Sequence, residues 1–201
     1  MRQGLIVVGV GALVLIVGGL LVNRGFMQPS NSGRGILESG TASTTMTTFS
    51  LSSSAFTQNA SIPSQYTCDG LQASPPLSIS GTPEGAASLA LIMEDPDVPK
   101  QLKPDGVFLH WVVFNIPASV TELVEGASVG VQGKNGAGKN GYAGPCPPPQ
   151  YEPSEHRYIF TLYALDANLS LEAGATKDAV VQAMEEHIVA QTQLIGKYKR
   201  K

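Results

Sequence analysis

Two segments that are far apart in the chain carry residue types that could build a binding site. The first is residues 95–99, Asp-Pro-Asp-Val-Pro, and His110 follows it on the next apolar run. The second is residues 141–149, Gly-Tyr-Ala-Gly-Pro-Cys-Pro-Pro-Pro, and His156 and Tyr158 follow it. Stiff loops that carry ionisable groups between strands are a common way for a scaffold to present a binding site. We therefore expect both segments to meet at one pocket.

The side chains in these segments suit recognition of a phosphate or carboxylate oxygen. Protonated histidines and the Tyr158 hydroxyl donate hydrogen bonds, and the backbone N–H of Cys146 is a further donor. Asp95 or Asp97 could orient a histidine and favour its charged form. Prolines remove donors and stiffen the loop, so the remaining N–H groups keep a fixed direction. The alternative for residues 95–97 is a simple turn, because aspartate and proline both favour turns.

Period-two geometry places both histidines near the start of an apolar strand face. Each is expected to share that face with apolar residues of its own strand: Phe108, Val112 and Phe114 for His110, and Tyr158, Phe160 and Leu162 for His156. Either ring alone could be a structural histidine at the rim of a core, since a buried titratable group is only a probabilistic marker of a site. The same placement of both rings beside proline-rich loops favours a shared pocket.

Short apolar runs dominate the rest of the sequence and predict strands at residues 76–80, 88–93, 107–115 and 157–165. Only the C-terminal part resembles a helix. Thr176 is a suitable N-cap, and Val180, Met184, Ile188 and Val189 fall on one helical face. With 22 glycines and 14 prolines and no βαβ alternation, the sequence predicts a mainly β fold, an antiparallel β-sandwich with a few peripheral helices including a C-terminal one.

The N-terminus predicts a membrane anchor. Residues 4–22 form an uncharged run of 19 residues, which as a helix spans about 28 Å, close to the thickness of a bilayer core. We expect an uncleaved transmembrane helix at residues 1–24, a flexible Ser/Thr/Gly-rich linker at 25–48 and a folded domain at 49–201. Arg2 argues for an N-terminus inside the cytoplasm, whereas Arg24 and Arg34 argue against it. An extracytoplasmic domain is the favoured localisation.

Composition and spacing exclude several function classes. The net charge is −3, with 16 acidic and 13 basic residues, and no basic face for nucleic acid is visible. Residues 133–140 nearly match a nucleotide phosphate loop, but Asn140 replaces the magnesium-binding hydroxyl and no helix can follow. Residues 136–141 match G-x-G-x-x-G but lack the same helix. No cofactor is expected, and neither H-x-H nor H-E-x-x-H spacing indicates a metal site.

Together these motifs resemble the phosphatidylethanolamine-binding protein family, and more narrowly its bacterial and archaeal Raf-kinase-inhibitor-like branch (YbhB/YbcL type). That branch typically shows Tyr-Thr-Cys-Asp-Gly followed by Ser-Pro-Pro-Leu, as at residues 66–70 and 74–77. The resemblance extends over residues 49–200. Val98 departs from it, because alanine is usual there, and Glu186 stands where the branch often has glycine.

The resemblance implies a β-sandwich with a small anion pocket that accepts phosphate-like head groups. Carried over by motif, the ligand-binding residues are Asp95, Asp97, His110, Gly144, Cys146, Pro147, His156 and Tyr158. No residue is assigned a catalytic role. Cys68 and Cys146 are the only cysteines, and they could form a disulfide outside the cytoplasm. The family also carries both in intracellular members, where they would serve packing.

Three classes of function follow from these residues. The first is a non-catalytic binding protein for a small anionic ligand or phospholipid head group, with a regulatory role. The second is an inhibitor that docks on a partner protease or kinase. The third, a metal- or cysteine-dependent hydrolase, would need a zinc site assembled from distant loops or a cysteine activated by histidine. The first class is preferred, so we expect no enzyme activity and no nucleic-acid partner.

Overall fold

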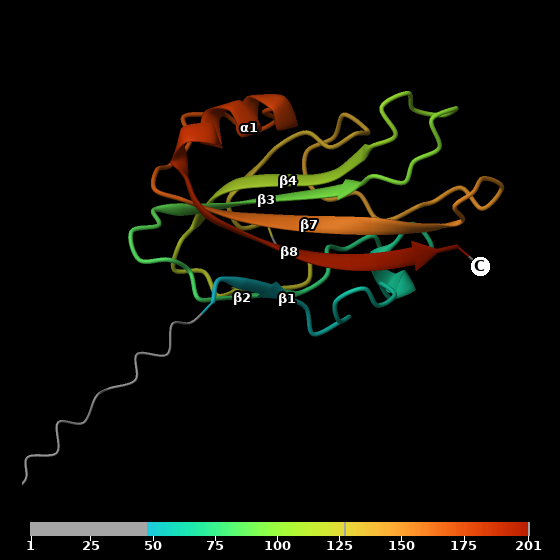
Figure 1. The fold of residues 1–201 in the computed structure, drawn as a ribbon, viewed down its shortest axis with the longest axis horizontal. Helices are drawn as coiled ribbons and strands as arrows, with labels where there is room; N and C mark the ends of the chain where they lie inside the picture. The colour runs from blue at the N-terminus through green and yellow to red at the C-terminus, as the bar shows by residue number, and fades with distance from the viewer. Residues whose placement is uncertain (1–47, 127, 201) are drawn as a thin grey trace, which may run out of the picture. The chain divides into compact units, whose positions relative to one another are not determined.

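The computed structural model describes residues 48–126 and 128–200, and within them two antiparallel sheets face each other (Figure 1). The smaller sheet has the order β1-β2-β5, with β1 at Ser50–Ser52, β2 at Leu77–Ser80 and β5 at Glu122–Leu123. The larger sheet has the order β6-β4-β3-β7-β8. Its strands are β3 Ser88–Asp95, β4 Phe108–Pro117, β6 Val131–Gln132, β7 Glu155–Leu165 and β8 Ile188–Lys199. The predicted antiparallel β-sandwich is confirmed.

The burial of each strand follows from its place in the sandwich. In β2 the side chains of Leu77 and Ile79 are buried while the intervening serines are exposed, as expected when one face meets solvent. The central strand β3 is buried along nearly its whole length. It can be apolar on both faces because the larger sheet is covered on both sides.

Two apolar clusters lie on the two faces of the larger sheet. The cluster between the sheets includes Leu51, Phe56, Ile62, Leu77, Leu89, Leu91, Trp111, Val113, Phe160 and Leu162. The cluster on the opposite face includes Ala90, Ile92, Val112, Phe114, Leu165, Val180 and Met184. Figure 1 shows helix α1 (Lys177–Met184) on the side of β3 and β4 away from β1 and β2. Helix α1 therefore closes the second cluster.

The C-terminal helix is shorter than predicted. Thr176 is its N-cap, and its side chain accepts a hydrogen bond from the N–H of Ala179 at 3.3 Å, as expected. Val180 and Met184 are buried, which also agrees with the prediction. The prediction is wrong for Ile188 and Val189, which begin strand β8 and are exposed. A short 3-10 helix, Glu185–His187, separates the two elements, and β8 then pairs with β7 along its full length.

The predicted membrane anchoring and the localisation drawn from it are corrected by the structure. None of the helices in the described ranges is long and apolar enough to cross a bilayer. The predicted transmembrane segment, residues 1–24, and residues 25–47 of the predicted linker lie outside the described residues. The domain boundary at Phe49 stays a prediction.

Candidate functional site

The two segments singled out in the sequence meet at a cavity of about 230 Å³. Strand β3 ends at Asp95, and its antiparallel neighbours β4 and β7 begin at Phe108 and Glu155. Because antiparallel neighbours start where the central strand ends, the side chains of these termini gather at one edge of the sheet. The cavity there is lined by Asp95, Val98, Phe108, His110, Ala143, Gly144, Cys146, Pro147, Pro148 and His156.

His110 reaches this cavity because strand β4 has a bulge at its position. Met93 pairs with Trp111 and Glu94 pairs with Leu109, so His110 is an extra residue without a partner on β3. A bulge redirects the side chain of the inserted residue. The predicted shared face with Val112 and Phe114 is therefore wrong, because those two residues pack in the cluster beside α1. The His110 ring instead contacts the ring of Tyr158 edge-on, with 5.1 Å between centroids.

His156 lies on the face predicted for it and forms a buried pair with Asp95. Its Nδ1 atom is 2.7 Å from Asp95 Oδ2, and the two side chains are 1% and 5% exposed. Burial, the largest effect, raises the pKa of the Asp95 carboxyl, and the hydrogen bond to His156 opposes that rise. The Nε2 atom of His156 is buried and has no partner among the described residues. Asp95 therefore fixes the ring and leaves one nitrogen unused.

His110 differs from the expected protonated donor. Its Nδ1 atom is 2.7 Å from the carbonyl oxygen of Ala143, so Nδ1–H donates and Nε2 is the remaining nitrogen. Burial lowers the pKa of His110 to about 4, and nearby His156 adds to that effect. The ring is consequently neutral near pH 7, and its Nε2 offers a lone pair. Burial is thus the main reason that the ring is neutral, and the expected pairing of His110 with Asp95 is absent because Asp95 is bonded to His156.

Asp97 does not line the cavity. It stabilises the edge of the cavity through hydrogen bonds with Arg157. Its carboxylate accepts hydrogen bonds from the backbone N–H of Arg157 at 2.9 Å and from the guanidinium at 2.8 and 2.7 Å. The hydrogen bond from the Arg157 side chain is the main reason that the pKa of Asp97 is lowered. This pair ties the loop after β3 to the start of β7. Arg157 had no role in the sequence-based site, and no spacing signal pointed to its pairing with Asp97.

Tyr158 lies beneath the cavity and is not among its lining residues. The side chain is fully buried, and its hydroxyl has no hydrogen-bond partner within the described part of the chain. Burial also raises the pKa of this hydroxyl above its ordinary value, so the phenol stays neutral. In this structure Tyr158 supports the His110 ring, and the predicted direct contact with a ligand stays a prediction.

Residues 144–148 form one wall of the cavity. Three of the five are prolines, so Gly144 and Cys146 supply the only backbone N–H groups. Neither group has an intramolecular acceptor in the described ranges. A Cβ atom at Gly144 would lie 3.0 Å from the backbone of Thr67, so glycine permits this close approach. Apolar contributions from Val98 and Phe108 were not predicted from the sequence.

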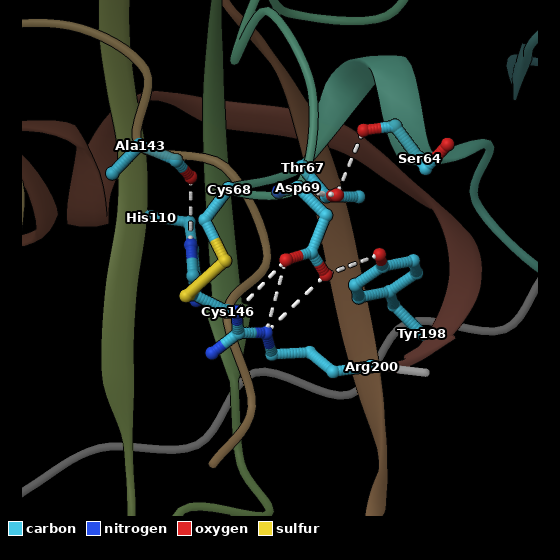
Figure 2. The surroundings of a disulfide bond; sticks show 9 residues. All are labelled: Ser64, Thr67, Cys68, Asp69, His110, Ala143, Cys146, Tyr198 and Arg200. Atoms are coloured by element: carbon cyan, nitrogen blue, oxygen red, sulfur yellow. Dashed lines mark hydrogen bonds and ion pairs between the residues drawn. A yellow bond between two sulfur atoms is a disulfide. The ribbon is translucent and has the colours of Figure 1, made fainter. Parts of the chain in front are cut away.

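A disulfide between Cys68 and Cys146 joins this wall to the segment around Cys68, which lies 78 residues earlier in the sequence (Figure 2). The two Cα atoms are 5.4 Å apart, within the range that a disulfide requires. The backbone N–H of Cys68 also donates to the carbonyl oxygen of Pro145 at 3.0 Å. In this structure the two cysteines are therefore bridged. The hypothesis of a cysteine nucleophile loses its support, because neither cysteine in this structure is free.

Metal-ligating side chains do not converge in the part of the chain that the structure describes. No three or more histidine, cysteine, aspartate or glutamate side chains there are grouped so that they could hold a metal ion. His110, His156 and Asp95 share the cavity, but Asp95 and His156 use their facing atoms on each other. Polar groups that stay without a partner among the described residues include Nε2 of His156, together with the Nε2 lone pair of His110 and the N–H groups of Gly144 and Cys146.

Comparisons with known proteins place the chain among related sequences and structures. The family model for phosphatidylethanolamine-binding protein matches residues 52–199. A UPF0098 protein from Chlamydia pneumoniae is 49% identical over 151 residues, which cover 75% of this chain and 98% of that protein. A UPF0098 protein from Methanothermobacter thermautotrophicus is 48% identical over 157 residues, with coverage of 75% and 98%.

Solved structures give the same result. A putative phosphatidylethanolamine-binding protein homologue from Chlamydia trachomatis has a TM-score of 0.73 at 47% identity, and the match covers 76% of this chain and 98% of that one. YbcL from E. coli, described as a member of the mammalian family, has a TM-score of 0.68 at 28% identity, with coverage of 76% and 99%. The resemblance of the sequence motifs is thereby confirmed, and the chain belongs to the phosphatidylethanolamine-binding protein family.

Proposed function

We propose that this chain is a non-catalytic binding protein whose cavity receives a small phosphate-like group, such as a phospholipid head group. The observation that carries the proposal is the convergence of two histidines, from the two strands that flank β3, on one small cavity. Each has a ring nitrogen that no described residue uses. Buried polar groups normally have partners. Unused nitrogens at a cavity therefore suit a ligand.

The protonation of the site favours a particular form of ligand. His110 is neutral near pH 7, because its pKa is about 4, and its Nε2 accepts rather than donates. A phosphate monoester has a second pKa of about 6, so its singly protonated form carries an O–H donor together with several acceptor oxygens. The O–H would donate to His110 Nε2. The N–H groups of Gly144 and Cys146 are the donors that the wall offers to the remaining oxygens.

The size and lining of the cavity also fit a small head group. A volume of about 230 Å³ corresponds to roughly seven or eight water molecules at about 30 Å³ each. A phosphate group and a short alkyl or aminoalkyl chain fill such a space. Phe108, Val98, Pro147 and Pro148 supply apolar surface for the alkyl part, in the manner of small-molecule sites with few polar groups.

Two features support a binding role over catalysis. Both cysteines are joined in the disulfide, so in this state neither can act as a nucleophile. Both oxygens of the Asp95 carboxylate are engaged, one by His156 Nδ1 and the other by the backbone N–H of Asp97, which makes this group a poor base toward a bound water. A regulatory role would follow if occupancy of the cavity changed the docking of a partner protein, such as a protease or kinase.

Calorimetric titration of the full chain with inorganic phosphate and with O-phosphoethanolamine tests the proposal. His110→Asn and His156→Asn should each weaken binding at least tenfold. His187→Asn is the matched control, because that exposed histidine pairs with Asp166 outside the cavity. Ethanolamine, which has no phosphate, should not bind. Absence of binding to the wild type, or an equal effect of all three substitutions, would refute the proposed function.

A further inference from the structure

We propose that the Cys68–Cys146 disulfide is an exchange site for small thiols, and that opening it frees the wall of the cavity. Cys146 is exposed and lines the cavity, whereas Cys68 is partly buried. Exchange rates depend on which sulfur a thiolate can reach. Because Cys146 is the more exposed residue and lines the cavity, its sulfur is the expected point of attack. The exchange step assumes nothing about the ligand, and only its effect on affinity rests on the proposed function.

The chemistry of the step is an ordinary thiol–disulfide exchange. The attacking thiolate forms a new S–S bond with Sγ of Cys146, and the bond between the two protein sulfurs breaks. The electron pair of that bond leaves with Sγ of Cys68, which then takes a proton from water. A second thiol, or the second group of a dithiol, displaces the mixed disulfide. The protein then holds two thiols, and the reductant is oxidised to its own disulfide.

The two sides of the bridge are held very differently. On the Cys68 side, the neighbouring Asp69 accepts a hydrogen bond from Tyr198 Oη at 2.7 Å and from Arg200 Nη2 at 2.9 Å. Both partners belong to the end of β8 or follow it directly. Figure 2 shows this group on one side of the disulfide, with His110 and Ala143 on the other. Cys68 should therefore keep its position when the bridge opens.

On the Cys146 side, little besides the bridge secures the wall. In the described structure, the hydrogen bond from the Cys68 N–H to the Pro145 carbonyl is the only backbone bond that ties residues 144–148 to another segment. The preceding residues are better anchored, since the Ala143 N–H donates to the His110 carbonyl at 2.8 Å and Tyr142 Oη donates to the Tyr66 carbonyl at 2.7 Å. Opening the bridge should thus release residues 144–148 and leave the rest of the site in place.

This release would alter the cavity because the freed residues carry two backbone N–H groups that have no acceptor within the described ranges. Gly144 and Cys146 hold the N–H groups that the wall offers, and Pro147 and Pro148 form its apolar surface. A wall that samples many positions must be ordered again on binding, which weakens affinity. A reducing environment would then lower occupancy of the cavity without any change in the histidines.

Thiol trapping and hydrogen exchange test the proposal on the full chain under native conditions. Reduced glutathione is the probe for the exchange step, and peptide mapping after rapid acid quenching should find its adduct on Cys146. Dithiothreitol should then give two alkylatable thiols. In the reduced protein the N–H groups of Gly144 and Cys146 should exchange at least tenfold faster, while exchange in β3 stays unchanged. Phosphate affinity should fall at least fivefold.

Several results would overturn the proposal. A bridge that opens only after denaturant is added, or an adduct on Cys68, contradicts exchange at the sulfur of Cys146. An unchanged exchange rate at Gly144 in the reduced protein contradicts release of the wall. The Cys68→Ser, Cys146→Ser double variant gives the same readout without reductant, and the reduced wild type replaces it if the variant does not fold. If the oxidised protein binds no phosphate, the proposed function fails, while labelling and hydrogen exchange still decide this inference.

Discussion

His110 should make the protein sensitive to mild acid. Its pKa is about 4 in the folded protein against an ordinary value of 6.5, because burial disfavours the charged ring. The unfolded chain therefore takes up a proton at a higher pH than the folded chain. Stability from the neutral ring is fully present above pH 6.5 and is lost as the pH falls from 6.5 towards 4. At about 1.36 kcal/mol per unit of pKa, the full loss is roughly 3 kcal/mol.

The substitution His110→Asn isolates this contribution. An asparagine amide can still donate to the carbonyl of Ala143, which accepts from His110 Nδ1 at 2.7 Å in the wild type, but it does not titrate. The comparison is needed because Asp95 acts in the opposite direction. Its folded pKa is raised by burial, so the folded chain keeps that proton longer and gains stability relative to the unfolded chain as the carboxyl protonates.

Urea unfolding at pH 7.5 and pH 4.5 measures the effect. Between these two values the wild type should lose roughly 2–3 kcal/mol more unfolding free energy than His110→Asn, because most of the interval from 6.5 to 4 is crossed. The variant is expected to be less stable than the wild type at both pH values. The quantity to compare is therefore the change in unfolding free energy of each protein between pH 7.5 and pH 4.5. Equal pH dependence of the two proteins would refute the assignment of His110 as a buried neutral ring.

Three further predictions concern the bridge, a close backbone contact and the ligand. The double substitution Cys68→Ser, Cys146→Ser should lower the unfolding free energy by about 4 kcal/mol, because the bridge spans 78 residues of sequence; a loss under about 1 kcal/mol in urea unfolding would contradict this. Gly196→Ala should cost about 1–3 kcal/mol, because its Cβ would lie 2.5 Å from the Ile62 side chain, and an unchanged Tm would argue against that packing. Sulfate, whose charge is constant over this range, should bind at least threefold more tightly at pH 5.5 than at pH 7.5, because an anion favours protonation of His110; calorimetry showing the reverse trend would exclude this linkage.

The central strands and the meeting of the two loops could be predicted from the sequence. Apolar runs at residues 88–93, 107–115 and 157–165 became β3, β4 and β7 with small changes at their ends. Because these runs are long and rich in β-branched or aromatic residues, local pattern was enough. Once they pair antiparallel, Asp95 and the two histidines must lie at the same edge of the sheet.

The pairing-dependent details could not be predicted. The bulge that redirects His110 depends on how β4 aligns with β3, and a single sequence does not contain that register. The choice of Asp95 for His156, and of Asp97 for Arg157, depends on the same alignment. Local pattern gave equal reason to pair either acid with either histidine.

Strand β8 shows a different kind of failure. The helical spacing of Val180 and Met184 continues by coincidence to Ile188, although the chain has already entered β8. Further along β8, burial alternates as in a strand with one buried face: Leu194, Gly196 and Tyr198 are buried, and Gln193 is exposed. Pairing of eleven of its residues with β7 overrides the local helical preference.

A crystal structure of the full chain grown with O-phosphoethanolamine tests the central claim most directly. We predict the phosphate group in the cavity between His110 and the wall at residues 144–148, with one phosphate oxygen at about 2.6–3.2 Å from His110 Nε2. An empty cavity at saturating ligand, or a phosphate bound only away from both histidines, would contradict it.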